Sequence, residues 1–355
     1  MSIRTCLPLA VLLPCLLGGA CEAAQFCVSD AVTLRGALGT AEANGEFDSI
    51  QVAIGDYAPF GGAAAFEYDT NEAFGVTLRG GYVKVNGQCV GPTLDPTLTV
   101  LSGSGVMPVL RLGGPAGAAG GIRVENLTVR SGRSTGSGGG GTLGGAGFQG
   151  GITVERVIVR NNDAEQFGGG LSIATASVLR VSNSLFLANR AGSGHAALSV
   201  AAERPDTAIN YIVGNTLVAN GCLPGDSCAA VMRVDSSSNA NVVIANNAFG
   251  LNDAGDDLQI DGSTSIGILH NNLVGLSGSV VPASNTANLA LLSPGFVDPL
   301  GGNYRLQTSS PLRDAGHATF AGGQPDLDGL PRVNGSSVDI GAYENQDNLF
   351  GDDFE

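Results

Sequence analysis

Tryptophan is absent from this sequence, lysine occurs once (Lys84), and charged residues make up only 14% of its 355 residues. The 32 acidic residues outnumber the 17 basic ones, which gives a formal net charge of −15. Because so acidic a surface repels phosphate backbones, and because basic patches with interleaved aromatics are missing, nucleic acid is excluded as a partner. Aromatic residues, at 5% of the chain, are too scarce to indicate a platform on which sugar rings stack.

Sustained apolar heptads are also missing, which excludes a coiled coil, and a hydrophobic share of 43% excludes a charge-rich disordered chain. Glycine is instead abundant, with 55 residues. The glycines lack the three-residue period of collagen, so they indicate frequent tight turns. This composition predicts a compact, turn-rich, all-β protein.

The first 24 residues have the pattern of an export signal. Arg4 provides a short basic region, residues 7–17 are apolar, and small residues follow, so we expect cleavage after Ala23 or Ala24. The apolar stretch is too short to span a membrane and no longer one follows it. The sequence therefore predicts an exported protein (periplasmic, extracellular or on the outer surface) without a transmembrane span. LLGGAC, which ends at Cys21, leaves a lipoprotein as the alternative.

Four cysteines remain after such a cleavage, and an even number in an exported chain indicates disulfides. They are Cys27, Cys89, Cys222 and Cys228. Three pairings are open, and the simplest joins Cys222 to Cys228 within CLPGDSC, which leaves Cys27 to pair with Cys89. Free buried thiols are the alternative. A zinc site is not indicated, because no second Cys or His pair accompanies CLPGDSC.

A repeat runs through the middle of the chain. Six segments share an aliphatic residue, a third position that is usually Asn, and a closing apolar residue: VENLTV (124–129), VERVIV (154–159), VSNSLF (181–186), VGNTLV (213–218), IANNAF (244–249) and LHNNLV (269–274). They recur every 25 to 32 residues. Their third positions hold Asn126, Arg156, Asn183, Asn215, Asn246 and Asn271.

A second column of residues keeps step with the first. It consists of apolar pairs with period-2 spacing: Leu171/Ile173, Leu198/Val200, Met232/Val234 and Leu258/Ile260. Such alternation marks short strands with one buried face, and no repeat contains a helical pattern. These features predict a single right-handed parallel β-helix whose rungs stack about 4.8 Å apart. The asparagines of the first column would then form a ladder of bonded amides, whereas a β-sandwich with asparagine-rich turns is the alternative.

Two stretches resemble bacterial exported β-helix proteins. CVSDAVTLRGALGTAEANGEFDSIQVAIGDY resembles their "CSLREA"-type N-terminal segment. SPGFVDPLGGNYRLQTSSPLRDAG, followed by PDLDGLPRVNGSSVDIGAYE, resembles their choice-of-anchor Q region. NLFGDDFE is similar to the short "FxDGFE" endings of some gammaproteobacterial exported proteins. The resemblance implies a pectin-lyase-like β-helix fold and an exported or surface-attached protein. It implies no defined reaction.

The ends of a β-helix need covering, because they expose core and strand edges. Thr33 to Gly45 carries Leu34, Leu38 and Ala41 at helical spacing, with Thr33 as candidate N-cap and Gly45 as stop signal. The expected organisation is a signal peptide at 1–24, an N-terminal cap with this helix at 25–60, β-helix repeats at 61–290, a C-terminal choice-of-anchor Q-like cap at 291–344 and an acidic tail at 345–355.

Motifs of the polygalacturonase type are incomplete in this chain. GDD is present at 255–257, but NTD, GHG and RIK are missing. The best candidate site comes from the alignment of VMRVDSS (231–237) with DLQIDGS (257–263), which places Asp235 one rung from Asp261 and Arg233 beside Gln259. Two carboxylates so close recruit a cation such as Ca²⁺ or raise one pKa.

Asp256 and Asp257 lie in the loop that enters the second of these strands and extend the candidate to a cation or sugar site. In an enzyme, Arg233, Asp235 and Asp261 would be the catalytic candidates. The alternative is that Asp235 and Asp261 are turn residues that bond their own backbone.

We therefore expect an exported or cell-surface protein, and a monomer, with a binding, adhesive or structural role. Polysaccharide or cell-envelope components are its expected partners. The alternative function is that of a polysaccharide lyase or glycoside hydrolase acting on an acidic polysaccharide.

Overall fold

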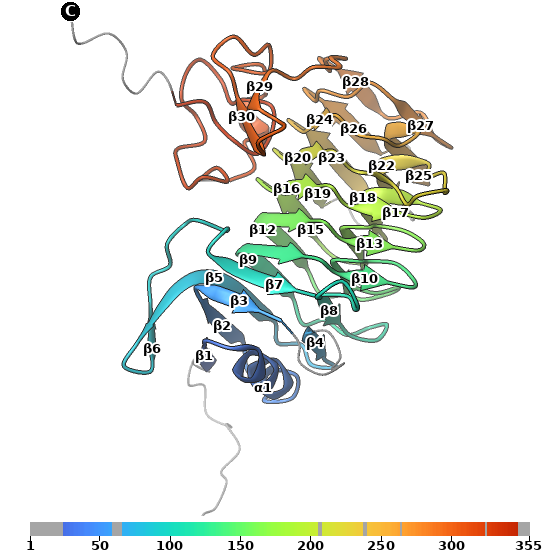
Figure 1. Cartoon of the computed structure of the whole chain (residues 1–355). Helices are drawn as coiled ribbons and strands as arrows, with labels where there is room; N and C mark the ends of the chain where they lie inside the picture. The colour runs from blue at the N-terminus through green and yellow to red at the C-terminus, as the bar shows by residue number, and fades with distance from the viewer. Residues whose placement is uncertain are drawn as a thin grey trace, which may run out of the picture.

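Short strands with alternating burial stack in parallel over successive repeats (Figure 1). The structure, a computed structural model, describes residues 24–58, 66–204, 208–236, 240–262, 265–323 and 325–346. Strands make up 45% and helices 5%, and the strands form a parallel β-solenoid of about seven turns. The all-β prediction is confirmed. The expected signal peptide with Cys21, and the tail beyond residue 346, lie outside the described residues.

The first and largest sheet runs the length of the solenoid. Its main path is β1 (Ala24–Val28), β2 (Asp48–Ala53), β5 (Val76–Val85), β9 (Ile122–Arg130), β12 (Ile152–Arg160), β15 (Leu179–Ser182), β19 (Ile209–Val213), β23 (Asn241–Ala245), β26 (Ile266–Leu269) and β28 (Ser284–Thr286). Beside this path lie β3 (Gly55–Tyr57), β6 (Gln88–Val90), β7 (Thr99–Ser102), β16 (Leu185–Leu187), β20 (Thr216–Val218) and β24 (Ala248–Gly250).

Two further parallel sheets complete the coil. The second sheet contains β4 (Phe66–Asp69), β8 (Leu110–Gly113), β11 (Gly141–Gly144), β14 (Leu171–Thr175), β18 (His195–Ala202), β22 (Ala230–Ser236), β25 (Asp256–Gly262) and β27 (Leu276–Gly278). The third contains β10 (Arg133–Ser134), β13 (Asp163–Ala164), β17 (Arg190–Ala191) and β21 (Gly221–Cys222). An antiparallel pair, β29 (Phe296–Asp298) and β30 (Asn303–Leu306), follows the solenoid in sequence.

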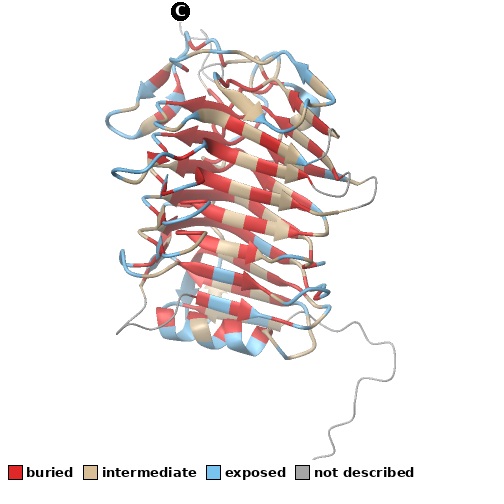
Figure 2. Cartoon of the chain, turned by 90° about the vertical axis from the view of Figure 1, so that its right-hand side faces the viewer, coloured by how far each residue is buried: buried red, intermediate tan, exposed pale blue. Residues whose placement is uncertain are grey.

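The apolar column of the repeat faces the interior of the solenoid. Leu171, Leu198, Met232 and Leu258 are consecutive partners along the second sheet. Each is at most 2% exposed, and Figure 2 shows buried residues alternating with more exposed ones along the stacked strands. Burying an aliphatic side chain in this way stabilises the fold by about 1.5–3 kcal/mol.

The N-terminal helix α1 (Ala31–Ala41) covers the first rungs, with Leu34, Leu38 and Ala41 buried as predicted. Its N-cap is Asp30 rather than Thr33, which corrects the sequence interpretation. The Asp30 side chain accepts from the Thr33 backbone N–H at 2.8 Å, and the Thr33 hydroxyl accepts from the Asp30 backbone N–H at 3.3 Å. Thr33 therefore closes a capping box from the third helical position.

Two ladders of side-chain amides run through the interior. The first has donor–acceptor distances of 2.9 to 3.0 Å and consists of Asn215, Asn247, Asn271 and Asn288. The second has distances of 2.9 to 3.2 Å and consists of Asn162, Asn189, Asn220 and Asn252. A buried amide left without its partner costs about 1–3 kcal/mol, so both ladders fix the rungs in register.

Asn126, Asn183 and Asn246 lie in a neighbouring column, which corrects the ladder expected from the sequence. Their φ angles are 48° to 55°, the left-handed region that asparagine tolerates at a corner. The error is one of register, because Val181 pairs with Ile212 and not with Val213. Their amides instead donate to backbone carbonyls of segments that cross the outside of the solenoid.

Two disulfides join Cys27 to Cys89 and Cys222 to Cys228, as predicted. The first ties β1 to β6, which extends from β5 as an antiparallel hairpin. None of the helices in the described part of the chain has the length and apolarity that crossing a bilayer requires.

The C-terminal segment, residues 291–345, lies along the side of the solenoid (Figure 1, orange to red). It shares a second hydrophobic cluster with the side strands: Ile158, Leu185, Val218, Ala248, Phe296, Tyr304, Leu306, Leu312, Leu327, Ile340, Ala342 and Tyr343. Its contacts therefore extend over several rungs, from that of Ala248 back to that of Ile158.

Candidate functional site

The site expected from the sequence lies on the outer face of the second sheet. Arg233 pairs with Gln259, and Asp235 with Asp261, as the alignment predicted. Arg233 Nη2 donates to Asp235 Oδ2 at 2.8 Å, and its Nε donates to Asp261 Oδ2 at 2.7 Å. The two carboxylates therefore share one guanidinium.

Asp261 is the most strongly held carboxylate of this group. Besides Arg233, the side chain of Gln259 donates to it at 2.8 Å and the Ser279 backbone N–H donates at 2.9 Å. Burial acts to raise the pKa of Asp261, but these hydrogen bonds outweigh burial and lower the pKa to about 2. The carboxylate is thus ionised over all but strongly acidic conditions.

Asp256 and Asp257 do not extend this group into one site. Asp256 opens β25 opposite Ala230, while Asp257 Oδ2 accepts from the Val274 backbone N–H at 2.7 Å. Burial raises the pKa of Asp257. Asp256 thus forms the start of β25, and Asp257 holds the turn around residue 274.

The carboxylates of this face do not fit a calcium ion. Ca²⁺ needs six or more oxygen ligands, whereas Asp235 and Asp261 each direct an oxygen at Arg233. Over the described ranges, no group of three or more His, Cys, Asp or Glu side chains could hold a metal ion.

His195 lies beside this face and is almost completely buried, at 5% exposed. Its ring stacks on Phe167 with the ring centroids 5.8 Å apart. Burial, together with the positive charge of Arg233, lowers the pKa of His195 to about 4. The imidazole is therefore neutral at pH 7.

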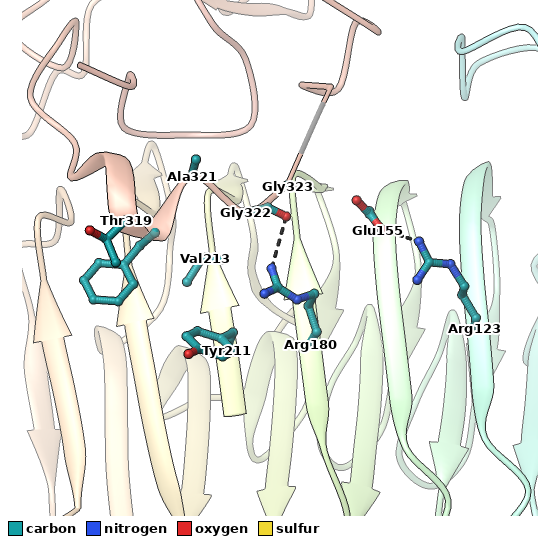
Figure 3. Close-up of a pocket in the computed structure, with 10 residues that line it drawn as sticks. Arg123, Glu155, Arg180, Tyr211, Val213, Thr319, Ala321, Gly322 and Gly323 are labelled. Atoms are coloured by element: carbon teal, nitrogen blue, oxygen red, sulfur yellow. Dashed lines mark hydrogen bonds and ion pairs between the residues drawn. The ribbon is translucent and has the colours of Figure 1, made fainter. Parts of the chain in front are cut away.

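A pocket that the sequence analysis did not predict lies on the outer face of the first sheet. It has a volume of about 370 Å³ and is lined from the solenoid by Arg123, Glu155, Arg180, Tyr211 and Val213, and from the C-terminal segment by residues 319–323 (Figure 3). We call residues 317–323 the roof. They include the 3₁₀ helix η2 (Ala318–Phe320).

Period-2 alternation places a row of side chains on this outer face. Arg123, Thr153, Arg180 and Tyr211 are successive partners on β9, β12, β15 and β19, one residue before the buried aliphatic position of each repeat. The outward positions of Arg123, Thr153 and Arg180 could have been found from the sequence, because each precedes an apolar residue of the first column. That of Tyr211 was hidden by the register error, since Tyr211 precedes Ile212 and not Val213. The roof could not have been found in this way, since it comes from a distant segment.

The charges around the pocket are unevenly matched. Glu125 forms an ion pair with Arg79, whose Nε lies 2.8 Å away, and accepts a hydrogen bond from Arg123 Nε at 2.6 Å, while Arg123 Nη2 donates to Glu155 at 2.5 Å. These four side chains form a row of alternating charge in which each has an oppositely charged partner. Arg180 is different, because no carboxylate of the described residues lies within ion-pair distance of it.

Arg180 is instead held by two uncharged groups. Its guanidinium lies over the Tyr211 ring, 5.0 Å from the centroid, and its Nη1 donates to the Gly322 carbonyl at 3.2 Å. A cation over an aromatic face is stabilised by about 0.5–2 kcal/mol and keeps its full charge. The pocket therefore contains a positioned, positively charged donor without an acidic partner.

The corner asparagines hold the roof in place. Asn246 Nδ2 donates to the carbonyls of His317 and Phe320 at 3.1 and 2.8 Å, and Asn183 Nδ2 donates to that of Gly323 at 3.3 Å. Arg156, the odd member of the expected Asn column, donates to the Asp326 and Leu94 carbonyls. The left-handed corner thus projects side chains outward to bind crossing segments.

Arg332 fastens the C-terminal segment from within and is completely buried. It donates to the Ala321, Asp339 and Gly341 carbonyls, and it pairs with Glu344 at 3.3 Å. Burial raises the pKa of Glu344 to about 7, although Arg332 opposes that change. The DIGAYE motif therefore supplies carbonyls and a carboxylate to a buried arginine that positions the roof.

A second hollow of about 400 Å³ adjoins the pocket at Arg123 and extends towards β5 and β2. We call it the trough. Its floor includes Gly75, Gly121 and Gly151, which precede β5, β9 and β12. A Cβ atom on Gly75 would come within 2.5 Å of the Gly121 carbonyl oxygen, so glycine is required there by close approach of the backbones.

Comparison with known proteins gave no match: no family model, no curated protein and no solved structure is similar enough to this chain to assign its family.

Proposed function

We propose that the protein is an exported β-solenoid that binds a carboxylate-bearing glycan in the roofed pocket without altering it chemically. The observation that carries the proposal is Arg180, which lines the pocket, lies 5.0 Å from the Tyr211 ring centroid and has no carboxylate partner among the described residues. A guanidinium of this kind binds a carboxylate by charge-assisted hydrogen bonds. In a chain of net charge −15, such a group selects acidic ligands locally against the general repulsion.

Export is supported by two features. The resemblance of residues 291–344 to the choice-of-anchor Q region favours an exported or surface-attached protein. Two disulfides fit an oxidising compartment outside the cytoplasm. Export would bring the protein into the compartment in which polysaccharides and other cell-envelope components occur.

The enzymatic alternative has weaker support from the geometry. A lyase needs a base that accepts a proton, but Arg233 donates hydrogen bonds to two carboxylates. In the roofed pocket, Glu155 is engaged by Arg123 at 2.5 Å. Neither face presents a carboxyl pair free to act as general acid and base.

The test is a panel of neutral and acidic glycans, measured by calorimetry with and without Ca²⁺. We expect an acidic glycan to bind the wild type, and Arg180→Gln to weaken it at least about tenfold, since a charged hydrogen bond contributes about 1.5–3 kcal/mol. Arg111→Gln is the matched control, because Arg111 is exposed and lies on the second sheet.

Two results would contradict the proposal. Binding that is absent across the panel, or equally strong in Arg180→Gln, would remove the role of the pocket. Ultraviolet absorbance from unsaturated products of a polyuronate would establish lyase activity in place of simple binding.

A further inference from the structure

We infer that the roofed pocket receives the end of a glycan chain and not an internal stretch of it. The inference rests on the proposed function and adds to it the part of the ligand that is recognised. It follows from the shape of the site, which is closed at one end along the solenoid axis and continues into the trough at the other.

The closed end lies between β19 and β23. The pocket is lined by β9, β12, β15 and β19, but not by β23, although Val243 on β23 is the next partner of Tyr211. Thr319 and Phe320 line the pocket on this side, and Figure 3 shows Thr319 beyond Tyr211 and Val213, at the far end of the row from Arg123.

Thr319 and Phe320 form the obstruction at the closed end, and hydrogen bonds hold this obstruction in place. Asn246, the residue after β23, donates to the carbonyls of His317 and Phe320, and its Oδ1 accepts from the His317 backbone N–H at 2.9 Å. Three hydrogen bonds therefore hold η2 over the corner after β23. Arg332 adds a fourth constraint by donating to the Ala321 carbonyl at 3.1 Å.

The other end of the pocket continues along the axis. Arg123 lines both the pocket and the trough, and the trough reaches Thr77 on β5 and Ser49 on β2. From β19 to β2 there are five strand spacings of about 4.8 Å, or about 24 Å in total. An extended chain can therefore enter from the β2 side and stop at the roof.

The chemistry of the two parts fits such a ligand. The terminal unit would place its carboxylate on Arg180, whereas later units would lie over the glycines of the floor beside the hydroxyls of Thr77 and Thr153. Those glycines have no side chains to keep a ring away from the backbone. Recognition of a chain end therefore needs Arg180 and the obstruction together.

The experiment uses the full chain and linear tetramers of galacturonate, glucuronate and mannuronate. Each is prepared unmodified, with a fluorophore on the reducing end, and with a bulky acetal on the non-reducing end. For the tetramer that binds in its unmodified form, we expect one of its two blocked forms to lose at least about tenfold in affinity. The other blocked form should bind within about twofold of the unmodified tetramer.

A variant then assigns the loss to the obstruction. Phe320→Gly keeps the backbone carbonyl that Asn246 binds but removes the ring, and it should restore binding of the excluded form. Phe167→Gly is the matched control, since Phe167 stacks on His195 beside the second sheet and should restore nothing.

The outcomes separate the two proposals. If no unmodified tetramer binds, the proposed function fails and this inference fails with it. If the unmodified tetramer binds and both blocked forms bind equally well, binding stands and end recognition is overturned. Loss of both blocked forms would overturn the open end at the trough.

Discussion

On the outer faces of both the first and the second sheet, side chains from stacked strands lie beside one another. The two faces differ in whether their arginine has a carboxylate partner. On the second sheet, Arg233 lies between Asp235 and Asp261 at 2.8 and 2.7 Å. On the first sheet, Arg180 has Tyr211 as its neighbour and the Gly322 carbonyl above it. On the second sheet the arginine has carboxylate partners within the sheet, whereas on the first sheet the arginine lies beneath the roof without one.

This difference shows what stacking in register can and cannot produce. Neighbouring rungs are about 4.8 Å apart, so opposite charges at equivalent positions pair with each other and leave little for a ligand. The roofed pocket arises where a segment distant in sequence covers the face. The Arg180–Gly322 hydrogen bond, for example, joins residues 142 positions apart.

The largest expected effect comes from releasing the roof. Arg332→Ala leaves the buried Glu344 without its partner, and breaking a buried pair in this way costs about 3–5 kcal/mol. We expect a lower free energy of unfolding in chemical denaturation and loss of glycan binding. We also expect early protease cleavage within residues 291–345. Retention of binding by the variant would show that the pocket does not depend on the roof.

A pH dependence should distinguish the uncovered second face. Since the pKa of His195 is lowered to about 4, the unfolded chain takes up a proton between pH 6.5 and 4 that the native protein does not. The contribution of His195 to stability should therefore fall as the pH falls through this window, by on the order of 3 kcal/mol. In urea denaturation, the difference in stability between the wild type and His195→Gln should change by this amount across the window, and a constant difference would contradict the assignment.

Replacing the arginine of each face in a separate variant tests the comparison further. Arg233→Gln leaves two carboxylates unpaired and should destabilise the fold by about 1–2 kcal/mol, without changing glycan affinity. Arg180→Gln should show the opposite pattern, with weaker binding and a stability loss below about 1 kcal/mol. Calorimetry and denaturation of both variants measure these quantities side by side. Loss of affinity in Arg233→Gln would move the binding site to the second sheet.

The smallest expected effect concerns calcium at the second face. Because Arg233 already bridges the two carboxylates, the double variant Asp235→Asn/Asp261→Asn should leave the heat of Ca²⁺ titration unchanged. A large loss of calcium binding in the double variant would restore the cation site considered from the sequence.

The sequence predicted some registers well because a mistake there would expose the core. Asp235 lies opposite Asp261 as expected, since Val234 and Ile260 beside them must both point inward. The Asn column was less certain. Asn246 and Asn247 are adjacent in sequence. Asn246 donates outward to the roof and Asn247 donates inward to the ladder, and the residue types alone do not distinguish the two roles.

The candidate site divides in the same way. Arg180 occupies an outward position that the repeat assigns, whereas that of Tyr211 depends on a register that the sequence alignment missed. Nothing in the repeats indicates that a pocket forms there. The roof and its fastening residue Arg332 belong to the last part of the chain. Their position depends on hydrophobic contacts of Leu312 and Ile340 with the side strands, which no local pattern encodes.

The amino-acid sequence by itself thus determined the solenoid and the register that places Asp235 opposite Asp261, because burial, spacing and turn chemistry are local and repeat along the chain. Only the tertiary structure decided that the C-terminal segment folds back along the side and roofs one face. That arrangement depends on a buried arginine and a second apolar cluster, whose members meet only after both parts of the chain have folded.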